Sequence, residues 1–168
     1  MVIGSPKQRL VLPGTTREQA WGWAREVFRG LLPAAAERGV SLCLEPLART
    51  ETNLINTVRE AMQMADEVAH PRFKVHLDVK AMTAEGRPLE TIIREAAGYV
   101  GHLHVNDANR NGPGWGDTDY GPIVAGLAAI RYDDMASVEV FDFSHGAERI
   151  ARSSLEFLRR VFGTRAPK

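Results

Sequence analysis

The chain has 168 residues, of which 44% are hydrophobic, and its 21 Lys and Arg side chains balance 21 Asp and Glu side chains. This length suits a single domain over 1–168 with a buried core, and the zero net charge argues against a broad electrostatic surface for nucleic acid or a membrane. Cys43 is the single cysteine, which excludes an intramolecular disulfide, and the sequence shows no signal peptide or membrane-spanning stretch, so we expect a cytoplasmic protein.

Strand-like and helix-like stretches alternate along the chain, which is the pattern of an α/β fold with parallel strands. Thr15 and Glu18 predict a capping box that begins the first helix, and Asn56 is the expected N-cap of the second. Pro88 and Pro122 stand where a first helical turn tolerates proline. In chain order, the sequence predicts the tail of a strand in 1–9, a helix over 16–38 with a kink at Pro33, a strand over 40–45, a helix over 57–69, a strand over 73–79, a helix over 88–100, a strand over 101–106, a helix over 122–130, a strand over 136–141 and a helix over 146–162.

Four consecutive predicted strands share a row of polar side chains on one face. In the strand over 101–106, Leu103 and Val105 alternate with His102 and His104, so one face is apolar and the other carries two imidazoles. The same comparison in the other three strands ends each polar row with a side chain of a metal-ligand type. The four residues found in this way are Glu45, Asp78, His104 and Glu139.

These four side chains are expected to converge, because the carboxyl ends of parallel strands meet at one edge of the sheet, where α/β proteins bind ligands. Three carboxylates in one place repel each other, and a divalent cation relieves that repulsion. Mostly oxygen ligands with one imidazole favour Mn²⁺ or Mg²⁺ and are also compatible with Zn²⁺, Co²⁺ or Fe²⁺. A single Asp, Glu or His at a strand end is more often a helix cap, a surface charge or a structural residue, so the prediction depends on all four lying in register. Cys43 and His76, one layer deeper, are interpreted as packing residues.

A resemblance to a known family is carried by five stretches: "LCLEPL", "VHLDVKAM", "HLHVNDAN", "GPGWGDTDYGPI" and "SVEVFD". They resemble the second half of the xylose isomerase-like TIM barrels, the sugar phosphate isomerase/epimerase superfamily. The resemblance covers nearly the whole chain, whereas the family's first three strand-helix units are missing. It implies an α/β fold that is a partial (β/α)8 TIM barrel of about five strand-helix units, strands 4 to 8.

The resemblance also implies roles for individual residues. The family's metal ligands fall on the four positions that the strand comparison identifies. In ketose 3-epimerases of this family the two glutamates that hold the metal also transfer the proton, which assigns catalysis to Glu45 and Glu139. Substrate-contacting positions of the family match Glu51, six residues after the first ligand, and Arg110, six residues after the His ligand.

One position departs from the family's pattern. The His that many members place three residues after the Asp ligand is Ala81 in this sequence, and Lys80 is the candidate that partly substitutes for it in substrate binding. This departure argues against a ketose 3-epimerase in particular, while leaving the metal site intact. The glycine-rich loop over 109–121 is expected to close over a sugar, with Trp115 offering an apolar face to the ring, and a plain flexible connection is the alternative.

Together these features predict a metal-dependent isomerase or epimerase of a sugar or sugar phosphate, which transfers a proton through an enediolate in a small sugar or polyol substrate. The alternatives are a metal-dependent lyase such as an inosose dehydratase and a non-catalytic barrel fragment. DNA repair enzymes of this fold need a basic groove and more histidines than the five present, so nucleic acid is not an expected partner. Because an incomplete barrel leaves two unpaired sheet edges, we expect a homo-oligomer or association with the missing amino-terminal half-barrel.

Overall fold

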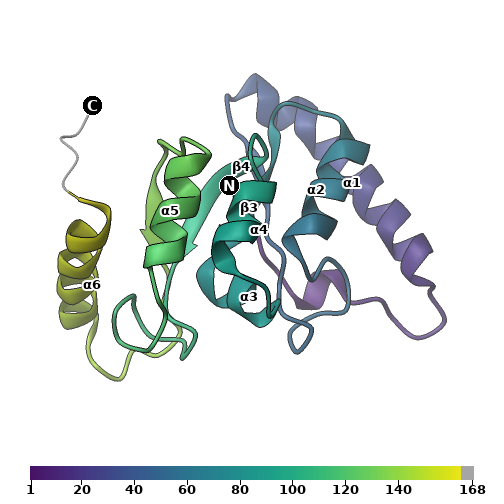
Figure 1. Cartoon of the computed structure of the whole chain (residues 1–168). Coiled ribbons are helices and arrows are strands. Elements are labelled where there is room, and N and C mark those ends of the chain that lie inside the picture. The colour runs from purple at the N-terminus through teal and green to yellow at the C-terminus, as the bar shows by residue number, and fades with distance from the viewer. Residues whose placement is uncertain (164–168) are drawn as a thin grey trace.

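One parallel sheet forms the centre of the molecule, in a computed structural model that describes residues 1–163 (Figure 1). Each strand pairs with the next one along the chain, in the order β1-β2-β3-β4-β5. Within the described residues, β1 and β5 each pair with one strand, so the sheet is open at both edges. The strands are β1 Val2–Ile3, β2 Leu42–Leu44, β3 Phe73–Asp78, β4 Val100–Val105 and β5 Ala136–Val138.

The helices succeed one another across the molecule, from α1 at one end to α6 at the other (Figure 1). At least one helix separates each pair of consecutive strands, so the chain forms five strand-helix units of a (β/α)8 barrel, which confirms the predicted fold class. Among residues 1–163, none of the helices is both long enough and apolar enough to cross a bilayer. The helices are η1 Lys7–Arg9, α1 Arg17–Glu37, α2 Val58–Val68, α3 Val79–Ala84, α4 Leu89–Glu95, α5 Gly121–Ala129 and α6 Ala147–Phe162.

The alternation of side chains along the strands decides what each face of the sheet does. The apolar row packs in one core with residues of α1, α2, α4 and α5. Its strand members are fully or almost fully buried, and they are Leu42, Leu44, Val75, Leu77, Leu103 and Val105. Because neighbouring side chains on a strand point to opposite faces, the polar row is directed away from these helices, toward the side that is the interior of a barrel.

The N-caps of two helices differ from the sequence prediction. The capping box of α1 lies one residue later than expected, because the Thr16 side chain accepts from the Gln19 backbone N–H and the Gln19 side chain accepts from Thr16. The helix runs through Pro33 to Glu37. The N-cap of α2 is Thr57, since its hydroxyl accepts from the backbone N–H of the third helical residue, whereas the Asn56 side chain donates to backbone carbonyls of the preceding loop.

Candidate metal centre and active site

The register of β3 and β4 brings two of the predicted ligands together. Asp78 pairs with His104 across these strands, at the carboxyl end of each. Glu45 directly follows β2, and its backbone N–H donates to Ile3 at the end of β1. Glu139 follows β5 in the same way, with its N–H on the Val105 carbonyl. The four predicted side chains therefore leave four neighbouring strand ends at the same edge of the sheet.

A tight cluster of four ligand-type side chains lies at this edge. Glu45, His76, Asp78 and His104 each offer one ligand atom, and these atoms all lie within 4.8 Å of one another. Glu45 and Asp78 are only 6% and 2% exposed, and His76 is 0% exposed. Three members are predicted ligands, whereas His76 was interpreted from the sequence as a packing residue.

Glu139 adjoins this cluster. One of its carboxylate oxygens lies 3.2 Å from Nδ1 of His104, at ion-pair distance. Glu139 lines a small cavity of about 130 Å³ together with the predicted ligands Glu45 and Asp78. The remaining residues that line this cavity are Gly4, Pro6, Leu47, Glu51, Lys80 and Phe141.

Burial and the neighbouring charges shift the pKa values of the clustered side chains. Burial raises the pKa of Glu45 to about 7, and the negative charges of Asp78 and Glu139 act in the same direction. Burial also raises the pKa of Asp78, against hydrogen bonds that act to lower it. For His104 burial acts to lower the pKa, but the Glu139 contact and the other carboxylates outweigh burial and raise it. The site is therefore rich in negative charge that a cation would stabilise.

The donor set fits a divalent metal ion. The carboxylates of Glu45 and Asp78 are hard oxygen donors, and the His104 imidazole is a nitrogen donor that all the expected divalent ions accept. Both ring nitrogens of His76 are buried without a hydrogen-bond partner in residues 1–163, which is rare for a buried polar side chain in a folded protein. An unpartnered imidazole beside two buried carboxylates is the arrangement expected of a metal-binding site.

Residues that the sequence comparison passed over hold the cluster in place. The Asn106 side chain donates to Oδ2 of Asp78 at 2.6 Å and accepts from the Lys80 backbone N–H at 2.8 Å. Asp78 also N-caps α3, since its Oδ1 accepts from the Ala81 backbone N–H at 2.7 Å. Asn106 belongs to the same alternating row as His102 and His104, so the pattern that identified the ligands contained its signal as well.

Two of the predicted substrate-binding residues, Glu51 and Lys80, line the cavity, and Arg110 lies close to its Phe141 wall. Lys80 Nζ lies 2.9 Å from Oε1 of Glu51, so the two form an ion pair. Phe141, which the sequence analysis did not single out, lies beneath two cations: Lys80 Nζ is 5.1 Å and the Arg110 guanidinium carbon 5.3 Å from its ring centroid. The Arg110 carbonyl also accepts from the Phe141 N–H, which ties the loop to the strand end.

Arg9 of η1 is a further residue that the sequence did not indicate. Its three guanidinium nitrogens are buried and make no hydrogen bond within the described chain. Burial lowers its pKa to about 10, while the nearby carboxylates of Glu45 and Glu51 act to raise it. Arg9 therefore places a positive charge near the carboxylates of Glu45 and Glu51.

The Trp115 side chain contacts α6 and the loop that precedes it. Its indole Nε1 donates to the Ser153 hydroxyl of α6 at 2.9 Å, and its ring centroid lies 4.5 Å from that of His145. The loop that carries Trp115 is fixed by Asp107, whose carboxylate accepts from the Gly116 N–H at 2.9 Å and the Thr118 hydroxyl at 2.5 Å. The structure thus brings seven of the eight predicted site residues to one edge and places the indole against α6.

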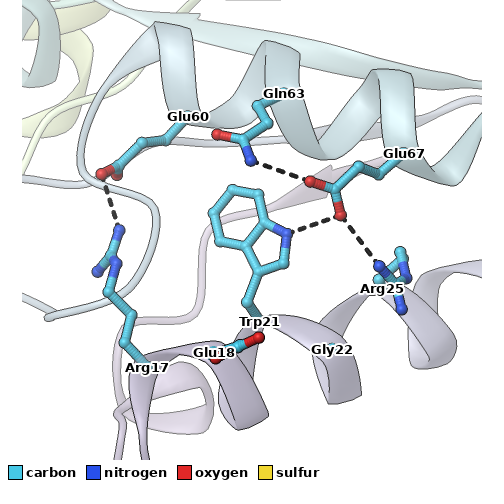
Figure 2. Close-up of a pocket in the computed structure, with 8 residues that line it drawn as sticks. All are labelled: Arg17, Glu18, Trp21, Gly22, Arg25, Glu60, Gln63 and Glu67. Atoms are coloured by element: carbon cyan, nitrogen blue, oxygen red, sulfur yellow. Dashed lines mark hydrogen bonds and ion pairs between the residues drawn. The ribbon is translucent and has the colours of Figure 1, made fainter.

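A larger hollow of about 760 Å³ lies between α1 and α2, and Figure 2 shows that most of its charged side chains are paired with each other. The Glu67 carboxylate accepts from Trp21 Nε1, Gln63 Nε2 and Arg25 Nη1 at 2.9, 3.0 and 3.2 Å. Arg17 pairs with Glu60 at 2.7 Å. Because these side chains already form hydrogen bonds and ion pairs with one another, this hollow is a weaker candidate for binding a charged ligand than the strand-end cluster.

The family to which the chain belongs is shown by a match to a family model, and the fold and the strand-end residues agree with it. The model of the xylose isomerase-like TIM barrel family matches residues 2–161. The chain belongs to this family. The resemblance found in the sequence is therefore confirmed, over nearly the whole chain.

Several proteins similar to this chain are sugar 3-epimerases. A D-psicose 3-epimerase from Ruminiclostridium cellulolyticum is 34% identical, over 87% of this chain and 57% of the relative. An L-ribulose 3-epimerase from Mesorhizobium japonicum is 30% identical, over 86% of this chain and 48% of the relative. The crystal structure of D-psicose 3-epimerase with D-tagatose from Clostridium cellulolyticum H10 superposes with a TM-score of 0.83 at 32% identity, over 89% of this chain and 58% of that one. The chain spans about half the length of the relatives that it matches.

Proposed function

We propose that the chain carries the metal-binding and proton-transferring residues of a metal-dependent ketose 3-epimerase. The observation that carries the proposal is the convergence of Glu45, Asp78, His104 and Glu139 at one edge of the sheet, in a chain similar to 3-epimerases. Ala81 in this chain argues against a ketose 3-epimerase. The relatives that the chain matches are nevertheless named as 3-epimerases. They are not lyases, so the dehydratase alternative gains no support from them.

Glu45, Asp78, His104 and Glu139 would hold the metal ion, with Mn²⁺ or Mg²⁺ expected from the mainly oxygen donors and Zn²⁺, Co²⁺ or Fe²⁺ also compatible. When bound, the ion would polarise the carbonyl and the neighbouring hydroxyl of the sugar and so make the intervening C–H bond more acidic. Asn106 holds the Asp78 carboxylate by its 2.6 Å hydrogen bond, which fixes the direction in which that ligand points.

The two glutamates supply the proton chemistry. One carboxylate takes the proton from carbon 3, the C–H electron pair moves toward the carbonyl to give an enediolate, and the other carboxylate returns a proton to the opposite face. Burial raises the pKa of Glu45 to about 7, and a bound cation would lower it, which would keep the carboxylate ionised and ready to accept a proton near neutral pH. Return of the proton to the other face changes the configuration and leaves the sugar otherwise intact.

The mouth of the cavity would recognise the sugar. Glu51 and Lys80 offer an acceptor and a donor for hydroxyl groups, and Arg110 adds a second donor. The Phe141 ring supplies an apolar surface between the two cations. The substrate class that fits is a small, uncharged or singly charged ketose, held mainly by hydrogen bonds.

We infer that the complete enzyme needs three more strand-helix units, because the sheet is open at β1 and β5 and the relatives are about twice as long. Apolar side chains beside β5 support this inference, since Met135 is 78% and Phe143 64% exposed. An amino-terminal half-barrel would pair with both edges and cover the side of the sheet that carries the acidic cluster. A second copy of the chain is the competing occupant, and light scattering distinguishes the two arrangements.

The test is proton exchange at carbon 3. The chain is incubated in D₂O with Mn²⁺ and either D-psicose or L-ribulose, alone and with the three amino-terminal strand-helix units of a relative supplied as a separate fragment. We expect deuterium at carbon 3 and the 3-epimer as product when the fragment is present, and loss of both in Glu45→Gln and Glu139→Gln. Deuterium-free sugar in every mixture contradicts the epimerase, and a dehydrated product identifies a lyase.

A further inference from the structure

His76 is the most completely buried ionisable side chain of the candidate site, and nothing in the proposed reaction uses it. It is 0% exposed, and neither Nδ1 nor Nε2 has a hydrogen-bond partner in residues 1–163. A buried imidazole that serves only packing normally donates its ring N–H to a carbonyl, a carboxylate or water. The lack of a partner for Nδ1 and Nε2 within residues 1–163 therefore indicates that His76 binds a ligand.

The surroundings of His76 indicate what that ligand is. Nε2 lies 4.0 Å from Oε1 of Glu45, too far for a hydrogen bond, and the ring centroid lies 4.1 Å from that of His104. Its ligand atom is within 4.8 Å of those of Glu45, Asp78 and His104. Donor atoms at such spacings surround one ion of ordinary coordination radius, since donors on opposite sides of such an ion are about 4–5 Å apart.

We propose that His76 is an additional ligand of the ion at this site, and that the second imidazole makes the site select Zn²⁺ over Mg²⁺. This inference rests on the proposed metal site and concerns which ion it takes. Two imidazoles with carboxylates form a mixed nitrogen and oxygen donor set, which borderline ions such as Zn²⁺ bind well, whereas Mg²⁺ prefers oxygen donors and retained water. The preference for Mn²⁺ or Mg²⁺ was based on a single imidazole and changes when His76 is included.

His102 provides a matched control on the neighbouring strand. It belongs to the same group of rings, with its centroid 5.5 Å from that of His76 and 5.3 Å from that of His104. Unlike His76, it has a partner, since Nε2 lies 3.0 Å from the Ser137 hydroxyl. His102 lies outside the group of four ligand atoms. A substitution at His102 therefore disturbs the ring packing without removing a proposed ligand.

The first experiment measures the affinities of the chain for Zn²⁺ and Mg²⁺ by competition titration, in wild type, His76→Phe and His102→Phe. Phenylalanine keeps a ring of similar size and removes both nitrogens. We expect His76→Phe to lose more than about 100-fold in Zn²⁺ affinity, beyond the range for a residue that only orients a ligand. Mg²⁺ affinity should stay within about threefold, and His102→Phe should change neither value by more than that. Equal losses for both ions, or no loss for Zn²⁺, would overturn the proposal.

The second experiment needs no variant and so does not depend on whether His76→Phe folds. X-ray absorption of the Zn²⁺-loaded wild-type chain counts imidazole ligands from their multiple-scattering signal. Two imidazoles support the proposal, and one overturns it while leaving the proposed function standing. Failure to bind either ion would overturn the metal site itself, and with it the function from which this inference starts.

Discussion

Gly4 and Glu45 meet at the ends of β1 and β2 so closely that a β-carbon on Gly4 would overlap the Glu45 carboxylate. The glycine backbone is not in the left-handed region, so the constraint at this position is space and not conformation. A strand end without a side chain thus leaves room for a buried acid that the proposed function uses as both ligand and base.

Gly4→Ala is therefore expected to displace the Glu45 carboxylate and to weaken Mn²⁺ binding on the order of tenfold or more, since ligand geometry is sensitive to such shifts. The rise in melting temperature with added Mn²⁺ measures the effect. Gly22→Ala in α1 is the control, because a β-carbon there meets no atom of residues 1–163 within 4 Å outside its own stretch of helix. It should raise stability by about 0.5–1 kcal/mol and leave the response to Mn²⁺ unchanged. Equal responses to Mn²⁺ in Gly4→Ala and wild type would contradict the steric explanation.

Asp78→Asn tests the charge that the metal requires. An ion present at about 100 times its dissociation constant stabilises the native chain by about 2.7 kcal/mol, which appears as a higher melting temperature. We expect wild type to show this rise with Mn²⁺ and Asp78→Asn to lose it, because an amide is a weak ligand for such ions. Asp117→Asn, at an exposed position of the loop, should keep the rise. A wild-type melting curve that Mn²⁺ leaves unchanged, with circular dichroism showing a folded chain, argues against the site.

Asp107 tests how firmly the glycine-rich loop is held. Asp107 is 0% exposed and its carboxylate accepts from Gly116 and Thr118, so its removal takes the acceptor from two partly buried hydrogen bonds. Asp107→Ala should cost about 3 kcal/mol in urea unfolding and should speed hydrogen exchange at the Gly116 and Thr118 amides. Asp117→Ala, on the exposed side of the same loop, should stay within about 0.5 kcal/mol of wild type. Unchanged exchange at both amides in Asp107→Ala would show that another group holds the loop.

Glu67 gives a pH dependence that is separate from the metal site. The hydrogen bond from Trp21, followed by that from Gln63, lowers the pKa of Glu67 below its ordinary value of 4.5. A carboxyl whose pKa is lower in the folded state stabilises the fold above its unfolded pKa, and that stabilisation is lost as the pH falls through the folded value. Glu67→Gln should therefore flatten the loss of stability from about pH 5 to about pH 3 in urea unfolding. Trp21→Phe should flatten it in the same direction, and a steeper acid dependence in either variant is the contrary result.

Strand periodicity is enough to predict which residues of each strand face the site. A β-strand alternates its side chains with period two, so an apolar row that must be buried leaves the other row to the opposite face, and Glu45, Asp78 and His104 follow from that rule alone. Parallel strands joined by helices then place their carboxyl ends at one edge. The alternation of strands and helices thus predicted the fold class, and the alternation of side chains predicted three of the four members of the ligand cluster.

The contacts that these side chains make depend on how distant segments come together in the fold. Whether His76 packs or binds depends on residues at the ends of β2 and β4, and no local pattern records that neither of its nitrogens has a hydrogen-bond partner within residues 1–163. Trp115 sits on a loop whose course is set by the buried Asp107 and by a hydroxyl of α6, so its position depends on an element 38 residues away. Phe141 lies beside Lys80 and Arg110 because three separate segments end at one edge. Strand periodicity acts between neighbours in the chain, whereas these contacts form through space between distant segments, and for that reason they emerge only when the chain is folded.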